Sequence, residues 1–360
     1  GILLCSMLGG MRAVTWTQVA QYIVLIIAYL IPVIWMSNKQ DFGLIPQLVY
    51  GDAVQRVTEL EQMHQVGVLK PTESFAGLKA LTVPFVAAGG GMEAWKFVTL
   101  AFCMMAGTAS LPHILMRYFT TPSVKSARRS VAWSLFFIFL LYFTAPALAT
   151  FTKLQILDPN LASGIIGKTI AEVNAIDWVQ KWSAVKFLAI SDSNGDGILQ
   201  INEFFMRGDI VVLATPEIAG LPYVISGLVA AGGMAAAMST ADGLLLAIAN
   251  ALSHDLYYKI IDPTAETAKR LVVARVLLVV LGAAGAFVAS LKLTSILGAV
   301  AWAFDFAMSG LFFPLVLGVW WKRANRQGAV AGMLCGFLAG TWYLYMVRWG
   351  GMEPWLGIDH

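Results

Sequence analysis

The sequence predicts an all-α protein that crosses a membrane several times. Its 360 residues are 58% hydrophobic and only 12% charged, and its mean hydropathy is +0.73. A soluble domain is usually about 45–50% apolar and about 25% charged, so this chain has too few charges to coat a water-facing surface. The composition disfavours a soluble enzyme, and the net charge of +3 is too small to indicate a nucleic-acid partner.

Long apolar runs are the second observation, because a spanning helix needs about 20 mostly apolar residues. Seven complete candidates occur, at residues 13–36, 92–116, 131–152, 222–252, 271–291, 295–320 and 328–347. The apolar segment 1–10 lacks the basic start of a signal peptide. We expect this segment to be the end of a further span, and the chain to be an interior piece of a longer protein.

The charges between the spans predict the topology. The short segments 117–130 and 322–327 contain Lys and Arg but no acid, and such segments stay in the cytoplasm. When one of them is placed inside, alternation of the spans places the other inside as well. The long loops 37–91 and 153–208 are then extracytoplasmic. The three cysteines each lie in an apolar run and predict neither a disulfide framework nor a metal cluster.

The span FCMMAGTASLPHILMRYF contains a helix break. Gly107 weakens the helix, and Pro112 removes a backbone donor. Backbone groups freed at membrane depth must face protein or a cavity, and transporters use such half-helix ends to hold ions and anions. An ordinary proline kink is the alternative. Thr108 and Ser110 lie between the two breakers and add hydroxyl groups.

A second span places polar groups among small residues. In AAAMSTADG, Ser239 and Thr240 follow three alanines, and Asp242 shares a helix face with Ser239. An ionisable residue inside a span is a functional hypothesis by default. Hydroxyl, carbonyl and carboxylate oxygens together suit a small hard cation. Alternatively, the two hydroxyls bond carbonyls one turn back, but that interpretation explains Asp242 poorly.

The outer loop 153–208 contains the twelve-residue pattern DSNGDGILQINE, which matches an EF-hand loop. The predicted calcium ligands are Asp192, Asn194, Asp196, the Ile198 carbonyl, Gln200 and Glu203. We expect helices on both sides, over 175–190 and from Glu203 towards Pro216, within an insertion at 175–208. EF-hands usually occur in pairs and only one is visible. The alternative is a solvated acidic loop. A structural calcium ion here would brace the outer loop against the 222–252 span.

Four stretches resemble the sodium:solute symporter family, and most of all its cation/acetate branch. They are GGMRAVTWTQVAQ at 9–21, GTASLPHILMRYFTTPSVKSARRS at 107–130, AAAMSTADG at 235–243 and SHDLYYK at 253–259. The resemblance covers nearly all of the chain apart from the outer loops. It implies the inverted-repeat fold of the leucine transporter type. The chain would then contain the second repeat and flanking helices, without the N-terminal helices.

The resemblance also implies a sodium site on the 222–252 span. Its ligands there would be the Ala236 carbonyl and the hydroxyls of Ser239 and Thr240. Some family members have a second cation site, whose acid belongs to a Thr-Asp pair that matches Thr17-Gln18 here. Because this chain has Gln18 at that position and an acid at Asp242, we hypothesise that the charge has moved across the site. Asp242 would then be a further ligand.

The implied solute site lies on the broken helix. Sugar and proline transporters of the family carry large aromatic residues just before its glycine, where this chain has methionines. The resemblance therefore implies a substrate without a ring, such as acetate or another short monocarboxylate. The expected contact residues are Phe102, Met104, Met105, Thr108 and Ser110. Asp305, an acid within the 295–320 span, either lines a cavity or pairs with a basic residue such as Arg275.

Together these observations predict one transporter domain over 1–360 that is not an enzyme. The expected function is sodium-coupled symport of a small organic anion by alternating access, in the bacterial inner membrane. Na⁺ would be the coupling ion and Ca²⁺ a structural one. The expected partners are the solute and the lipid bilayer, with a small membrane subunit or a second copy as candidate protein partners, and no nucleic acid. The alternative is a symporter-like sensor that forms the input module of a membrane signalling protein.

Overall fold

The computed structural model describes residues 2–355 apart from 72, 74, 76–77, 88–92, 119, 162 and 292–295, with side chains from residue 10 onward. Within the described residues, six helices are long and apolar enough to cross a membrane, and a bent helix pair adds a seventh. All seven predicted spans are therefore present. The predicted starts at Met92 and Ser295, and the first residue of segment 1–10, lie outside the described residues.

The chain divides into two compact units, 1–91 with 125–242 and 92–124 with 243–360. Helix α9 (Tyr223–Asn250) continues from the first unit into the second. The first unit also contains α1 (Ile2–Lys39), α2 (Pro46–Met63), β1 (Lys79–Ala80), α5 (Val124–Leu157), α6 (Ile170–Asn174), α7 (Asp177–Ala184), β2 (Leu188–Ile190), β3 (Phe204–Met206), η2 (Gly208–Ile210) and α8 (Val211–Ile218). The second contains α3 (Ala94–Ser110), α4 (Pro112–Tyr118), η3 (Ala251–Ile261), α10 (Thr267–Ser290), α11 (Ile296–Ala307), η4 (Met308–Phe312), α12 (Phe313–Trp320) and α13 (Arg326–Arg348).

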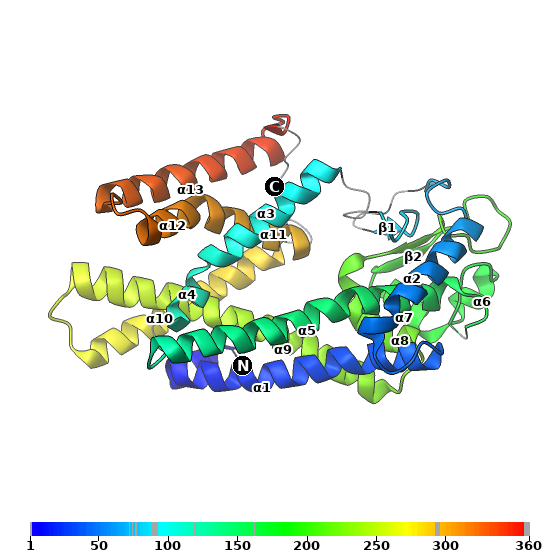
Figure 1. The fold of residues 1–360 in the computed structure, drawn as a ribbon, viewed down its shortest axis with the longest axis horizontal. Coiled ribbons are helices and arrows are strands. Elements are labelled where there is room, and N and C mark those ends of the chain that lie inside the picture. Colours follow the sequence, from blue (N-terminus) through cyan, green and yellow to red (C-terminus); the bar gives the residue numbers. More distant parts are fainter. Residues whose placement is uncertain are drawn as a thin grey trace. The chain divides into compact units, whose positions relative to one another are not determined.

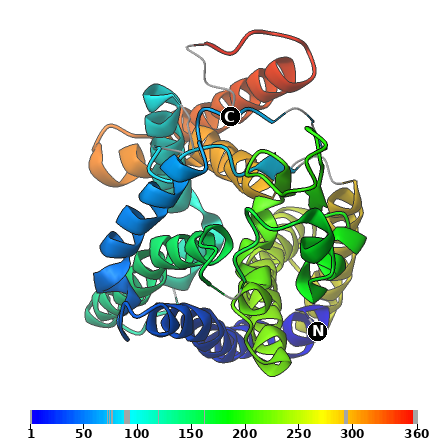
Figure 2. The same ribbon diagram turned by 90° about the vertical axis from the view of Figure 1, so that its right-hand side faces the viewer.

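Long helices dominate the first unit. In Figures 1 and 2, α1 (blue) runs beside α9 (yellow-green). Their contact is close because Gly232 has no side chain: a Cβ atom there would lie 2.8 Å from the Cβ of Ala28. Helix α1 joins α5 through a hydrogen bond of 3.1 Å from the Tyr22 hydroxyl to the Phe137 carbonyl. Gly10, with φ 56°, separates segment 1–10 from the span that follows it.

The two long loops of the first unit fold together into a small structure with its own core. Three short antiparallel strands pair in the order β1-β3-β2, with Met206 opposite both Lys79 and Leu188. Buried apolar side chains such as Phe151, Leu199 and Phe204 pack around them. This sheet was not predicted, because its strands are only two or three residues long.

The prediction of helices on both sides of the acidic loop holds only in part: α7 lies within 175–190 and α8 includes Pro216, but neither helix reaches the loop. Helix α7 ends at Ala184, and the loop is flanked by the strands β2 and β3. All three residues of β3 are buried, and the strand pairs on both edges. Apolar β-prone residues at the two ends of the loop thus gain more from pairing with each other than from continuing a helix.

The second unit contains the predicted helix break. Helix α3 ends at Ser110 and α4 begins at Pro112, and the two helices are bent by 43°. Leu111 between them is extended, because a residue before proline is disfavoured in the helical region. Five residues before the break, Gly107 packs against α11, where a Cβ atom would lie 2.6–2.9 Å from Phe304.

Candidate functional site

The predicted cation ligands meet on one turn of α9. The Ser239 hydroxyl donates to the Ala236 carbonyl at 3.1 Å, and the Thr240 hydroxyl reaches the same carbonyl at 3.3 Å. Three oxygen atoms therefore gather at one point of an apolar helix. The same bonds also fit the alternative interpretation, in which each hydroxyl only donates to a backbone carbonyl one helical turn earlier. Asp242 lies on the next half-turn and is only 1% exposed.

Helix α1 reaches the same turn of α9 through Gln18. Its side-chain amide donates to the Ser239 carbonyl at 2.6 Å, between residues 221 positions apart in the sequence. The position at which some family members carry an acid thus lies beside the hydroxyl turn in this chain. Gln18 is neutral and so brings no negative charge to that place, whereas Asp242 is a carboxylate.

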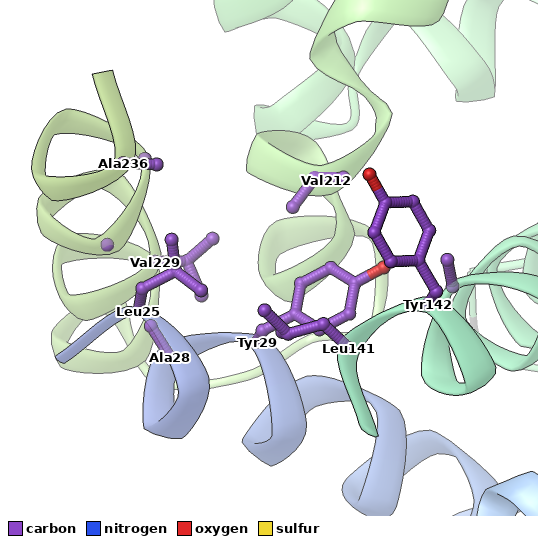
Figure 3. Close-up of a pocket in the computed structure, with 11 residues that line it drawn as sticks. Leu25, Ala28, Tyr29, Leu141, Tyr142, Val212, Val229 and Ala236 are labelled. Atoms are coloured by element: carbon purple, nitrogen blue, oxygen red, sulfur yellow. The ribbon is translucent and has the colours of Figure 1, made fainter. Parts of the chain in front are cut away.

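Ala236 also lines a cavity of about 340 Å³ in the first unit. Figure 3 shows Leu25, Ala28, Val229 and Ala236 on one side of this cavity and Tyr29, Leu141, Tyr142 and Val212 on the other. Apart from the two tyrosine hydroxyls, the side chains of its lining are apolar. The lining carries no charged group that would pair with a carboxylate, so the cavity provides mostly apolar surroundings for the hydroxyl turn.

The residues predicted to bind the solute do not form one surface. Thr108 donates its hydroxyl to the Met104 carbonyl at 2.6 Å, and Ser110 donates to the Ala106 carbonyl at 2.8 Å. Both hydroxyl hydrogens are used within α3, so a solute carboxylate would have to displace these bonds. Met105 is 72% exposed and Ser110 is fully buried.

A second cavity, of about 300 Å³, lies between α3 and α11 and does contain one predicted solute residue, Phe102. Asp305 lines the same cavity, which supports the first of its two alternatives. The remaining lining residues are Trp95, Val98, Thr99, Cys103 and Met308. Thr99 and Phe102 are three residues apart, a spacing that places them on one helix face. Nothing local in the sequence distinguishes Thr99 from the other threonines, so its place in this lining could not be predicted.

The acidic loop folds around its first and last acids. Asp192 accepts hydrogen bonds from the backbone amides of Gly195 (2.8 Å) and Gly197 (3.1 Å). Glu203 accepts from those of Ser193 (3.0 Å) and Gln200 (3.1 Å). Among the described residues, no group of three or more His, Cys, Asp or Glu side chains is placed to hold a metal ion. Any ion here would therefore also need amide and carbonyl oxygens.

The model of the sodium:solute symporter family matches residues 2–176 and 210–336. The chain belongs to this family, and with its apolar helices it is a multi-pass membrane protein. The match leaves out residues 177–209, which contain the acidic loop.

Two curated relatives and one solved structure are similar to the chain. An uncharacterised symporter of Cupriavidus necator is 39% identical over the whole chain, which spans 64% of that relative. A monocarboxylic acid transporter of Corynebacterium glutamicum is 25% identical over 94% of the chain, which spans 53% of it. The solved structure is a Na⁺-coupled sialic acid symporter in a substrate-bound outward-open state. The alignment covers 97% of this chain and 59% of the symporter chain, with a TM-score of 0.52 and 20% sequence identity. The chain shares this symporter's fold, the leucine transporter type that the sequence predicted.

Proposed function

We propose that the full-length protein moves a short monocarboxylate, such as acetate, into the cell together with Na⁺ by alternating access. The contact between Gln18 and the Ser239 carbonyl carries this proposal. It brings α1 against the turn of α9 where two hydroxyls and a carbonyl gather next to a buried carboxylate. We place the protein in a bacterial inner membrane, with loops 37–91 and 153–208 outside.

The chemistry of this turn suits a sodium ion. Hydroxyl and carbonyl oxygens are hard ligands, and hard cations prefer them. Asp242 adds one negative charge, which would offset the charge of one bound cation inside a low-dielectric segment. A cation that binds better to one conformation shifts the equilibrium towards it. If that conformation also binds the solute more tightly, the two binding events are coupled.

The substrate class rests on the broken helix and on one relative. The monocarboxylic acid transporter of Corynebacterium glutamicum supports a small organic acid. The cavity lined by Phe102 and Thr99 offers an apolar wall that suits a methyl group. The Thr99 hydroxyl donates to the Lys96 carbonyl at 2.9 Å, so a solute carboxylate would have to displace that bond to reach it. Because Asp305 lines the same cavity, its carboxylate would repel an anion unless a proton or a cation lies between them.

Radiolabelled acetate uptake into proteoliposomes with the full-length protein tests the proposal. We expect uptake to require an inward Na⁺ gradient and to be lost in the double variant Ser239→Ala/Thr240→Ala. Thr341→Ala is the matched control, because Thr341 makes the same back-bond on α13 to the Phe337 carbonyl. Uptake that follows a proton gradient without Na⁺ would contradict sodium coupling. If no member of a panel of short acids moves under either gradient, the symport proposal is wrong and the sensor interpretation stands.

A further inference from the structure

We infer that residues 192–203 bind one calcium ion, with an EF-hand ligand order carried on two strands instead of two helices. The inference does not depend on the proposed transport function. The candidate oxygen donors come from three acids, two side-chain amides and one backbone carbonyl. They are Asp192, Asn194, Asp196, the Ile198 carbonyl, Gln200 and Glu203. These are positions 1, 3, 5, 7, 9 and 12 of the ligand pattern, with Gly197 at position 6.

The backbone of the loop already has the turn that this pattern needs. Gly195 and Gly197 have φ angles of 73° and 72°, which residues with a side chain rarely adopt. Both oxygens of Asp192 accept backbone amides from these two glycines. The first ligand of the pattern therefore lies inside the turn, where an ion would be.

A neighbouring segment holds the second half of the loop. The Leu199 amide donates to the Lys168 carbonyl (2.8 Å), and the Leu199 carbonyl accepts from the Gly167 amide (2.9 Å). The Ile170 amide donates to the Gly197 carbonyl at 2.9 Å, and the Leu199 side chain is fully buried. EF-hand loops usually occur in pairs, and in this chain the segment 167–170 takes the place of the second loop. It keeps the Ile198 carbonyl, the position 7 ligand, in a defined place.

The charge around Glu203 points to a cation independently of the ligand pattern. Glu203 is only 1% exposed and its carboxylate faces the loop, where its partners are the neutral groups of Ser193 and Gln200. No salt bridge to it occurs among the described residues. From Phe187 to Met206 the sequence contains three acids and no Lys, Arg or His. A buried carboxylate without a counter-charge is unfavourable, so a cation would stabilise this loop.

The donor set fits calcium better than magnesium. Calcium accepts six to eight oxygen ligands in flexible geometry, whereas magnesium requires a near-ideal octahedron. The Asp196 carboxylate accepts hydrogen bonds from the Ile198 amide and the Asn194 side chain, both at 2.8 Å. The side chains must still turn from their amide donors towards a common ion, since no three acidic groups converge in this form. Calcium should therefore order the loop further.

The segment 177–209 lies between the two stretches that match the symporter family. The site therefore belongs to a part of the chain that the family model does not require. We infer that a calcium ion in this loop would act on the small sheet formed by the two long loops. It would fix the ends of β2 and β3 and brace them against the 222–252 span. It is not a coupling ion.

Calcium binding to the purified full-length protein in detergent tests the inference. After treatment with a chelator, titration with ⁴⁵Ca²⁺ should show one ion per chain, with affinity in the range of about 0.1–1 mM that extracellular sites have. Magnesium at about tenfold excess should not displace it. Limited proteolysis within 192–203 should slow when calcium is present.

Substitutions inside and just outside the loop test whether the calcium binds at residues 192–203. Asp196→Asn changes an exposed side chain and keeps an oxygen that can accept the Ile198 amide, and Glu203→Gln changes the buried ligand. Each should weaken binding about tenfold or more. Asp209→Asn, an exposed acid just outside the loop, is the control and should bind as the natural chain does. The inference is overturned if the natural chain binds no calcium at about 1 mM, or if both loop variants bind it unchanged. Neither result depends on whether the protein transports acetate.

Discussion

Asp242 is an acidic residue buried in a membrane-spanning helix, and the proposed sodium site needs its negative charge. It is 1% exposed within a helix of small and apolar residues. A charge in such a place is costly, so it needs a compensating interaction. The neighbouring Gln18 donates an amide to the same turn, which makes Asp242 the residue that could carry the negative charge there. Its exchange for a neutral isostere therefore tests whether that charge holds a cation.

Asp242→Asn should raise the Na⁺ concentration needed for half-maximal uptake by about tenfold or more, equivalent to about 1.4 kcal/mol. The amide keeps the size of the side chain but removes its charge, so the thermal midpoint in detergent should hardly change. Asp177→Asn, which removes one partner of the exposed pair with Lys181, is the control and should leave uptake unaffected. Unchanged sodium dependence in Asp242→Asn would show that the charge has another role.

At the scale of elements, the break between α3 and α4 depends on close packing as well as on proline. The backbone of Gly107 lies against Phe304 of α11, with no room for another carbon atom. Helix α3 therefore approaches α11 more closely than a side chain would allow. This contact lies beside the cavity that contains Phe102 and Asp305. A change in helix spacing should therefore reach the candidate solute site.

Gly107→Ala should destabilise the protein by about 1–3 kcal/mol, because the new Cβ atom overlaps Phe304 and the helices must move apart. The thermal midpoint in detergent and the affinity for the solute should both fall. Gly318→Ala on α12 is the matched control, since its Cβ atom would meet nothing within 4 Å. Alanine favours a helix over glycine, so this control should be neutral or slightly stabilising. Equal midpoints for the two variants would contradict the packing argument.

For the whole molecule, the distribution of Lys and Arg predicts which loops face outward. The short segments 117–130 and 322–327 have basic residues and no acid, whereas the acidic loop 192–203 belongs to the long loop 153–208. In the structure the two long loops share one sheet and one buried core. They must therefore lie on the same side of the membrane, which agrees with the alternation of the seven spans.

Cysteine labelling of intact cells tests this topology. In a background without the three natural cysteines, Lys181→Cys should react with a membrane-impermeant maleimide added outside. Lys125→Cys should react only after the membrane is permeabilised. Both positions are exposed, so a failure to react reflects the side of the membrane and not burial. The opposite pattern would invert the topology and place the acidic loop in the cytoplasm.

Much of this molecule was predictable because its signals are local. A run of about 20 apolar residues predicts a span wherever it occurs, and all seven spans were found. The break at Leu111 follows from Pro112. The flanks of the acidic loop were predicted wrongly, because helical spacing over 175–190 was outweighed by the pairing of β2 with β3. That pairing joins residues on both sides of the loop, and no local pattern contains it.

The sequence by itself determined the membrane class, the seven spans and the broken helix, since each depends on neighbouring residues along one stretch of chain. Only the tertiary structure decided that Gln18 lies on the Ser239 turn and that Asp305 shares a cavity with Phe102. It alone decided that segment 167–170 supports the acidic loop. The physical reason is that helix packing brings together residues as far as 221 positions apart, through side-chain shapes that hydropathy does not encode.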